Sequence, residues 1–127
     1  MFSRHLLESA AWTDDGLRLA VRLNWYRALP LSCVERLEIR LDGARLDPGL
    51  IALEIGGRRF PLAELAGQDD AWWHVPEVCR VSIDLEPATR TADATVELLL
   101  GTRIPYLVSP GGEAVVIVDR ATAAVPS

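Results

Sequence analysis

Lysine is absent from this sequence of 127 residues, which also has only two cysteines, two histidines and one methionine. Its 13 arginines face 18 acidic residues, so the formal net charge is −5. An acidic chain of this kind lacks the excess of cations that binds nucleic-acid phosphates, which argues against nucleic acid as a partner. No hydrophobic run is long enough to cross a membrane as a helix, and the charged N-terminus is not typical of a signal peptide. We therefore expect a cytoplasmic protein that binds no membrane.

Half of the residues are hydrophobic and 24% are charged, a balance typical of a folded domain rather than a disordered chain. A chain of 127 residues is long enough to bury a core within one domain. The sequence has no internal repeat or linker, so residues 1–127 are predicted to form a single domain. The exclusive use of arginine is explained most simply by genome composition, although arginine is also typical of protein interfaces.

Hydrophobic and polar residues alternate in several segments, a period typical of half-buried strands. The pattern is clearest where Leu17, Leu19 and Val21 alternate with arginine and alanine. The segments predicted as strands are residues 17–25, 34–41, 50–55, 59–62, 81–86, 96–104 and 114–118. Short strands at such regular intervals, with no convincing helix, predict an all-β fold. We expect an antiparallel β-sandwich of about seven or eight short strands.

Proline, glycine and alanine set the expected ends of these segments. Pro30 and Pro105 have no N–H to donate, so each is predicted to end a strand. Gly56-Gly57 is typical of a tight hairpin between two strands. Residues 63–66 are compatible with a short helical turn, and the alanine-rich tail at residues 121–127 is expected to be frayed. The opening segment is compatible with either a helical turn or an edge strand.

The side chains that carry most catalytic and metal chemistry are few and scattered. His5 and His74 belong to unrelated segments, so they are not expected to share a metal. Cys33 and Cys79 have no metal-ligand spacing and are predicted to be small buried hydrophobes. The adjacent carboxylates of Asp69-Asp70 are typical of a solvated loop. We therefore expect no catalytic, cofactor-binding or metal-binding residue in this chain.

The sequence has four tryptophans but only two tyrosines and two phenylalanines. On a strand, the adjacent Trp72 and Trp73 would face opposite sides, so at least one is expected outside the core. An exposed ring is suited to stacking on a sugar or to anchoring a protein interface. The alternative is that one ring fills the core and a loop covers the other.

Two strand ends share the same composition, namely an arginine, a proline and a tyrosine. The first contains Tyr26 and Arg27, and the second contains Arg103, Pro105 and Tyr106. We hypothesise that the two ends lie side by side and form one recognition patch. A location of Tyr26 and Tyr106 at opposite poles of the fold would contradict this hypothesis.

Several segments are similar, in the same order, to those of a known family. They are residues 25–32, which read Trp-Tyr-Arg-Ala-Leu-Pro-Leu-Ser, followed by residues 34–37, 41–43, 53–60, 71–73 and 103–106. On these residues the chain resembles the small β-subunit of bacterial C-glycoside deglycosidases. The similarity extends over most of the chain, whereas residues 74–77 and 87–94 depart from the family's pattern.

The resemblance implies a heteromeric, lyase-type enzyme in which this chain is a non-catalytic subunit. The partner in that family is a larger, barrel-type α-subunit that carries a divalent, manganese-like metal and the catalytic residues. The complex cleaves the carbon–carbon bond between a 3-oxo sugar and an aromatic aglycone, because the ketone acidifies the C2 proton and permits elimination. The small subunit is then expected to brace the barrel and border the mouth of its active site.

Tryptophan, tyrosine and arginine are the side chains that most often anchor protein interfaces. The residues expected at the partner interface or active-site mouth are Tyr26, Arg27, Trp73, Arg103 and Tyr106. Two alternatives remain open: a stand-alone carbohydrate-binding β-sandwich that stacks sugars on Trp72 or Trp73, and a homo-oligomeric structural protein. Quenching of tryptophan fluorescence by a sugar, without any partner, would favour the first alternative.

Overall fold

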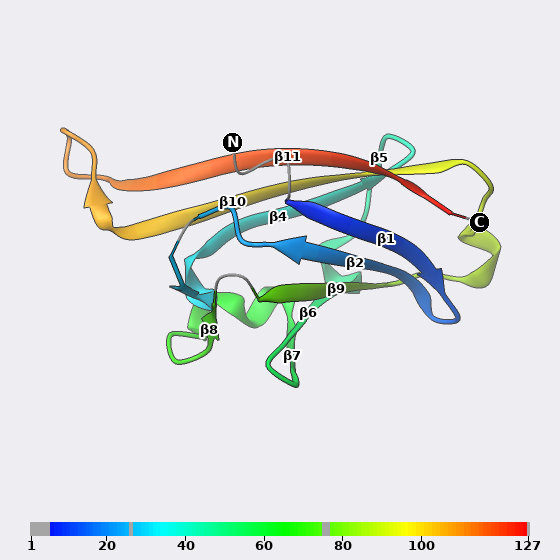
Figure 1. Cartoon of the computed structure of the whole chain (residues 1–127), viewed down its shortest axis with the longest axis horizontal. Coiled ribbons are helices and arrows are strands. Elements are labelled where there is room, and N and C mark those ends of the chain that lie inside the picture. Colours follow the sequence, from blue (N-terminus) through cyan, green and yellow to red (C-terminus); the bar gives the residue numbers. More distant parts are fainter. Residues whose placement is uncertain (1–5, 26, 75–76, 127) are drawn as a thin grey trace.

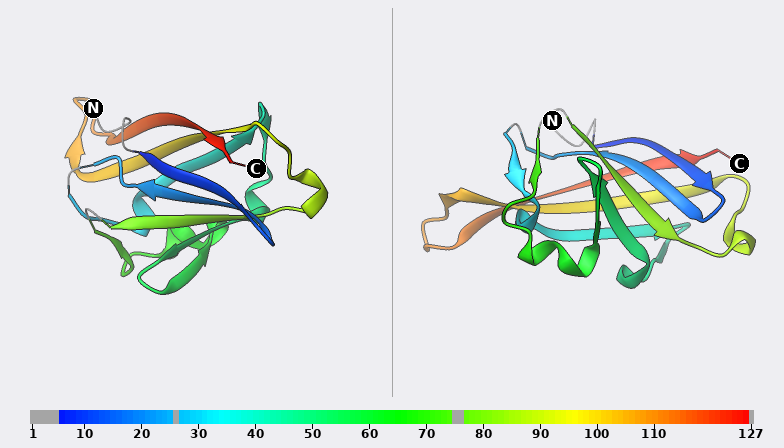
Figure 2. Two further views of the ribbon diagram at one scale, coloured as in Figure 1. Left: turned by 45° about the vertical axis from the view of Figure 1, so that its right-hand side comes forward. Right: turned by 90° about the horizontal axis from the view of Figure 1, so that it is seen from below.

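The computed structural model describes residues 6–25, 27–74 and 77–126, and these residues are mostly in antiparallel strands. Two sheets face each other and enclose a hydrophobic core (Figure 1, Figure 2). The predicted antiparallel, all-β fold is confirmed. Within the described residues, no helix has the length and apolar character needed to span a membrane.

The larger sheet has five strands in the spatial order β1-β2-β9-β6-β7. Their bounds are Leu7–Thr13 (β1), Gly16–Arg22 (β2), Val78–Asp84 (β9), Ile51–Ile55 (β6) and Arg58–Pro61 (β7). β1 is an edge strand, which settles the conformation of the opening segment from Leu7 onward. The β6–β7 hairpin turns at Gly56-Gly57 as predicted, because the φ angles of 60° and 78° there favour glycine.

The smaller sheet has four strands in the order β11-β10-β4-β5. Their bounds are Ala114–Val125 (β11), Ala94–Val108 (β10), Val34–Leu41 (β4) and Ala44–Arg45 (β5). β10 pairs with β4 on one side and with β11 on the other, so β10 is the central strand of this sheet. β11 lies against β1 of the larger sheet and closes one side of the sandwich (Figure 1).

A separate two-stranded pairing joins β3 (Leu29–Pro30) to β8 (Trp72–Trp73). Pro30 is the last residue of β3, and the preceding strand β2 ends at Arg22, earlier than predicted. Short 3₁₀-helical turns occupy Leu31–Cys33, Pro48–Leu50, Leu62–Gly67 and Pro87–Thr89. The third of these turns contains the helical turn predicted at residues 63–66.

The prediction that Pro105 ends its strand is wrong, because β10 continues to Val108. Ile104 pairs with Val115 and Val108 pairs with Ala114, so three residues of β10 have no partner across the hairpin. Pro105 is the first of these bulged residues, and at that position a missing N–H removes no ladder hydrogen bond.

The predicted short last strand with a frayed tail is also wrong. β11 extends to Val125, which pairs with Ala94 at the start of β10 and is buried. Ala121 pairs with Leu98 in the same ladder. Alanine has a weak strand propensity, but the side chains at alternate positions of this tail pack against the core, and this tertiary packing decides its structure.

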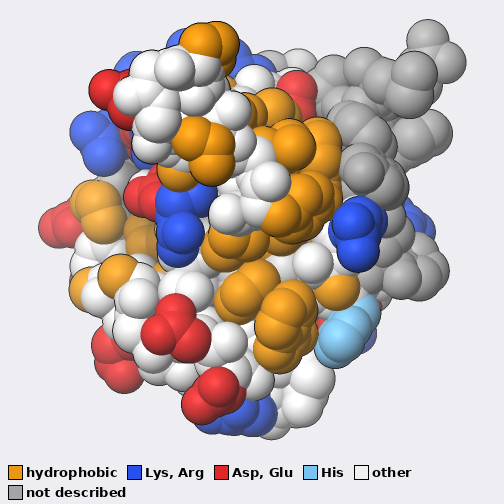
Figure 3. All heavy atoms as spheres, turned by 90° about the vertical axis from the view of Figure 1, so that its left-hand side faces the viewer, with side chains coloured by type: hydrophobic (Ala, Val, Ile, Leu, Met, Phe, Trp, Pro, Cys, Tyr) orange, Lys and Arg blue, Asp and Glu red, His pale blue; other side chains and the backbone are white. Residues whose placement is uncertain are grey.

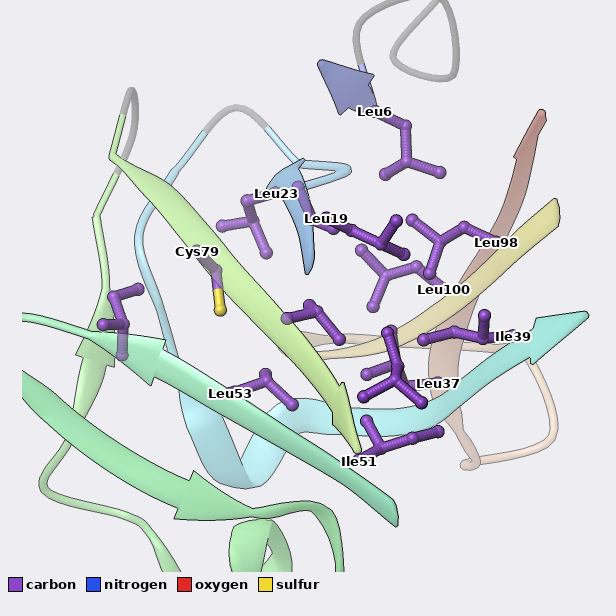
Figure 4. Close-up of a cluster of buried hydrophobic side chains, with 14 of the residues drawn as sticks. Leu6, Leu19, Leu23, Leu37, Ile39, Ile51, Leu53, Cys79, Leu98 and Leu100 are labelled. Atoms are coloured by element: carbon purple, nitrogen blue, oxygen red, sulfur yellow. The ribbon is translucent and has the colours of Figure 1, made fainter. Parts of the chain in front are cut away.

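The core consists of the inward-facing residues of both sheets (Figure 4). Leu19 of β2 and Leu53 of β6 come from the larger sheet, whereas Leu37 of β4 and Leu98 of β10 come from the smaller one. All of these residues lie at positions of alternating hydrophobicity in the sequence. The alternation is therefore the physical reason for both the strands and the sandwich.

One polar side chain lies among these hydrophobic residues. Asn24 follows β2 and is fully buried. Its Nδ2 donates to the carbonyl oxygens of Leu100 (3.3 Å) and Ile117 (3.1 Å), on β10 and β11 respectively. The hydroxyl of Thr102 donates to the Asn24 Oδ1 at 2.6 Å. These three hydrogen bonds satisfy the buried amide and join the segment after β2 to the β10–β11 hairpin.

We predict that Asn24→Ala lowers the free energy of unfolding by about 2–3 kcal/mol, because it leaves Thr102 and two carbonyl groups buried without this partner. A chain of this size should then lose roughly 10 °C in Tm. Urea titration and thermal unfolding measure both quantities. Thr122→Val, at an exposed position of β11, is the control and should change the stability by less than about 0.5 kcal/mol. Equal stability of the two variants would contradict the prediction.

Candidate partner interface at one end of the sandwich

The two segments expected to lie side by side do meet at one end of the sandwich. The Arg27 guanidinium lies over the Tyr106 ring, with Cζ 5.1 Å from the ring centroid. Trp25 Nε1 donates a hydrogen bond of 2.5 Å to the Tyr106 hydroxyl. We call Trp25, Arg27 and Tyr106 the Tyr106 cluster. Tyr26, the other expected tyrosine, lies outside the described residues.

The bulge in β10 explains how Tyr106 reaches this position. Residues 105–107 are the unpaired part of β10, and a bulge of this kind re-aims side chains that a regular ladder would direct elsewhere. Beyond Ile104 and Val115, the hairpin extends past the other strands (Figure 1, Figure 2). We call this extension, residues 105–114, the arm.

Hydrogen bonds close the tip of the arm. The backbone N–H of Ser109 donates to the carbonyl of Glu113 at 2.7 Å, and that of Gly112 donates to the carbonyl of Ser109 at 2.9 Å. Gly112 has a φ of 85°, a conformation that favours glycine. The Ser109 hydroxyl accepts a further hydrogen bond from the Glu113 N–H. The tip is therefore a defined turn.

The surface of the hairpin is rich in hydrophobic side chains. In the described part of the chain, seven large hydrophobic residues are exposed, and five of them lie on β10 and β11. These five are Tyr106, Leu107, Val108, Val116 and Val118. Figure 3 shows hydrophobic side chains gathered across this end of the molecule. An apolar surface of this kind is typical of a protein interface.

Trp72 and Trp73 face opposite sides of their strand, as expected for adjacent residues. Trp72 is 46% exposed, whereas Trp73 is 1% exposed and is the largest fully buried side chain. Trp73 Nε1 donates to the carbonyl of Glu77 at 2.9 Å. The expectation that Trp73 lies at an interface or active-site mouth therefore needs correction: its ring packs in the core of this chain, and Trp72 is the accessible member of the pair.

The two expected arginines differ in their electrostatic environment. The Arg103 guanidinium forms an ion pair with Glu35 of β4, with a distance of 2.9 Å between Nε and Oε1. Arg27 is exposed and has no carboxylate within 4.0 Å among the described residues. Arg27 can therefore still pair with a carboxylate of another molecule.

Side chains that could serve in catalysis or metal binding do not gather into a cluster in the described part of the chain. Among the described residues, no three His, Cys, Asp or Glu side chains come together as metal ligands would; His5 lies outside that part of the chain. Cys33 and Cys79 are free thiols buried in the core, as predicted. Burial raises the pKa of the Cys79 thiol to about 12 and also raises the pKa of Cys33. Neither cysteine is thus a thiolate at neutral pH.

The sequence interpretation missed the hydrophobic residues of the arm and of β11. A signal was present, since Leu107-Val108 and Val115 to Val118 are hydrophobic pairs and runs on either side of the Pro110-Gly111-Gly112 turn. In a strand, every second residue of such a run must face away from the core. A strand predicted to end at Pro105 does not include Leu107 and Val108, so their exposure is not anticipated.

Fold and surface together define a small all-β protein with one aromatic and apolar end suited to binding another protein. A sequence profile of the C-glycoside deglycosidase beta subunit family matches residues 9–106. The C-glycoside deglycosidase beta subunit of Microbacterium trichothecenolyticum is 33% identical over 126 residues, which cover 96% of this chain and 94% of the relative. The chain belongs to the C-glycoside deglycosidase beta subunit family.

Two further relatives have similar identity. The 3'-dehydrocarminate deglycosidase beta subunit of a Microbacterium species is 31% identical over 112 residues, covering 84% of this chain and 82% of that protein. A C-glycoside deglycosidase beta subunit of Arthrobacter globiformis is 31% identical over 101 residues, covering 79% and 77%. The resemblance inferred from the sequence is confirmed by these matches.

We predict that Trp25 and Tyr106 are energetically coupled through their hydrogen bond. In a double-mutant cycle, Trp25→Phe and Tyr106→Phe should show a coupling free energy of about 0.5–1.5 kcal/mol by urea unfolding. The cycle of Trp72→Phe with Tyr106→Phe is the control, because no hydrogen bond joins that pair, and it should be additive within about 0.5 kcal/mol. Additivity in the first cycle as well would contradict the coupling.

Proposed function

We propose that this chain is the non-catalytic β-subunit of a heteromeric C-glycoside deglycosidase. In this proposal, a larger barrel-type α-subunit performs the reaction and binds a divalent, manganese-like metal. The observation that carries the proposal is the membership of a β-subunit family together with the uncovered apolar end. A subunit whose partner buries that end has a physical reason to keep it apolar.

The substrate class that we propose is a C-glycoside with a 3-oxo sugar and an aromatic aglycone. The name of the Microbacterium relative, 3'-dehydrocarminate deglycosidase beta subunit, is consistent with an oxidised sugar as substrate. A ketone at C3 makes the neighbouring C2 proton acidic, so a base can remove that proton and the aglycone can leave by elimination. A divalent metal would polarise the carbonyl and assist this step.

The contribution of this chain is to support the catalytic subunit. Its two thiols are buried and protonated, and its Tyr106 cluster presents a guanidinium and aromatic rings at the surface. Groups of this type bind and position a protein surface better than they transfer protons. We therefore place Arg27 and Tyr106 at the contact with the α-subunit or at the border of its active-site mouth.

Co-expression with the barrel-type α-subunit tests the proposal. The two chains should elute as one complex in gel filtration, and cleavage of a 3-oxo C-glycoside should require both chains. Two separate peaks, with full activity in the α-subunit alone, would overturn it. The exposed Trp72 keeps a carbohydrate-binding module as the second candidate, which sugar-dependent quenching of tryptophan fluorescence in the isolated chain would support.

We predict that Arg27→Ala weakens binding to the α-subunit about tenfold or more, since an interface arginine is a frequent hot spot. Its stability should fall by less than about 1 kcal/mol, because an exposed cation–π contact contributes little to folding. Titration calorimetry and urea unfolding measure the two effects. Arg90→Ala, an exposed arginine after the Pro87–Thr89 turn, is the control and should change neither. Unchanged affinity with a large loss of stability would show that Arg27 is structural.

A further inference from the structure

We propose that the arm, residues 105–114, is the docking element of this chain, and that it enters an apolar groove of the catalytic subunit. This inference rests on the proposed function and specifies which part of the chain makes the contact. The groove carries a carboxylate that pairs with Arg27. The residues of the arm that enter it are Leu107 and Val108.

The arm exposes hydrophobic side chains to solvent. Val108 is 64% exposed, the highest value among the large hydrophobic residues that the structure describes, and Leu107 is 37% exposed. Hairpin tips are usually built from Gly, Pro, Asn, Asp and Ser, which interact well with water. Here the turn residues have that composition, but the strand ends that carry them are apolar. Burial of such side chains by a partner contributes favourably to the free energy of binding.

The base of the arm is held in place by contacts with the rest of the chain. An extended hairpin would lose conformational entropy on binding if it were free to swing. The Tyr106 side chain holds the base of the arm against Trp25 and Arg27, and the buried Asn24 holds the strands just below it. The arm is therefore pre-organised, so that little of its binding energy is lost in ordering it.

The positive charge of Arg27 indicates what chemistry the partner must offer. Arg27 lies at the base of the arm, over Tyr106, with no carboxylate within 4.0 Å in the described residues. A desolvated guanidinium at an interface requires a hydrogen-bonded anion. The net charge of −5 disfavours an anionic membrane surface as the occupant. A protein groove with apolar walls and a carboxylate at its rim satisfies both the arm and Arg27.

The test replaces hydrophobic residues on and off the arm by aspartate in the full chain. Leu107→Asp and Val108→Asp change the arm. Leu50→Asp is a matched control, because Leu50 is also 37% exposed and lies beside Asp14 and Asp15 of the β1–β2 turn, at the end opposite the arm (Figure 1). Binding to the purified α-subunit is measured by calorimetry, and folding by Tm.

Each arm variant should bind the α-subunit about tenfold or more weakly than the wild type, with Tm unchanged. Leu50→Asp should stay within about twofold. If an aspartate variant unfolds, Leu107→Ser and Val108→Thr replace it.

Wild-type binding with equal affinity in the arm variants would overturn the docking inference and leave the proposed function standing. Failure of the wild type to bind would overturn both, and a dimer of the isolated chain that Val108→Asp dissociates would identify a second copy as the occupant.

Discussion

The hydrogen bonds of Asn24 fix the geometry of the end of the sandwich that carries the Tyr106 cluster. A buried amide is costly unless its donors and acceptor are satisfied, and here the satisfying groups are Thr102 and two backbone carbonyls of the β10–β11 hairpin. These hydrogen bonds hold the segment after β2 against the hairpin. Trp25 follows Asn24 directly, and its indole meets Tyr106 as a result.

The core is closed to solvent, whereas one end of the sandwich leaves apolar side chains uncovered. Trp73 is an example of the closed core, since its ring is buried there and its N–H donates to the Glu77 carbonyl. Val108 is an example of the uncovered end, as an aliphatic side chain facing water on an extended hairpin. A monomer would be more soluble with polar residues there. Membership of a family of subunits gives this end a physical explanation, because a subunit is completed by its neighbour.

Most of the sandwich could be predicted from alternation alone, because half-buried strands such as β2 and β4 have a period that only a sheet satisfies. The local rules failed where tertiary structure overrides them. Pro105 does not end β10, since a bulge accommodates its missing N–H. The alanine-rich tail is ordered because β10 offers it a full ladder. The buried position of Asn24 has no local signal, since its partners are 76 and 93 residues away.

The candidate site could be predicted only in part from the sequence. Composition drew attention to Arg27 and Tyr106, and the structure brings these two residues together. Periodicity leaves open which of Trp72 and Trp73 faces the core, because both faces of a two-residue strand are equivalent in sequence. That orientation depends on the pairing of β8 with β3.

The three unpaired residues of β10 separate the direction of the arm from the structure of the sandwich. Residues 105–107 lie outside the ladder, whereas the pairs below Ile104 are regular. An insertion or deletion of one residue in this bulge would rotate everything beyond it without shifting a single core contact. The residues that fix the interior of the sandwich are thus separate from those that set the direction of the arm.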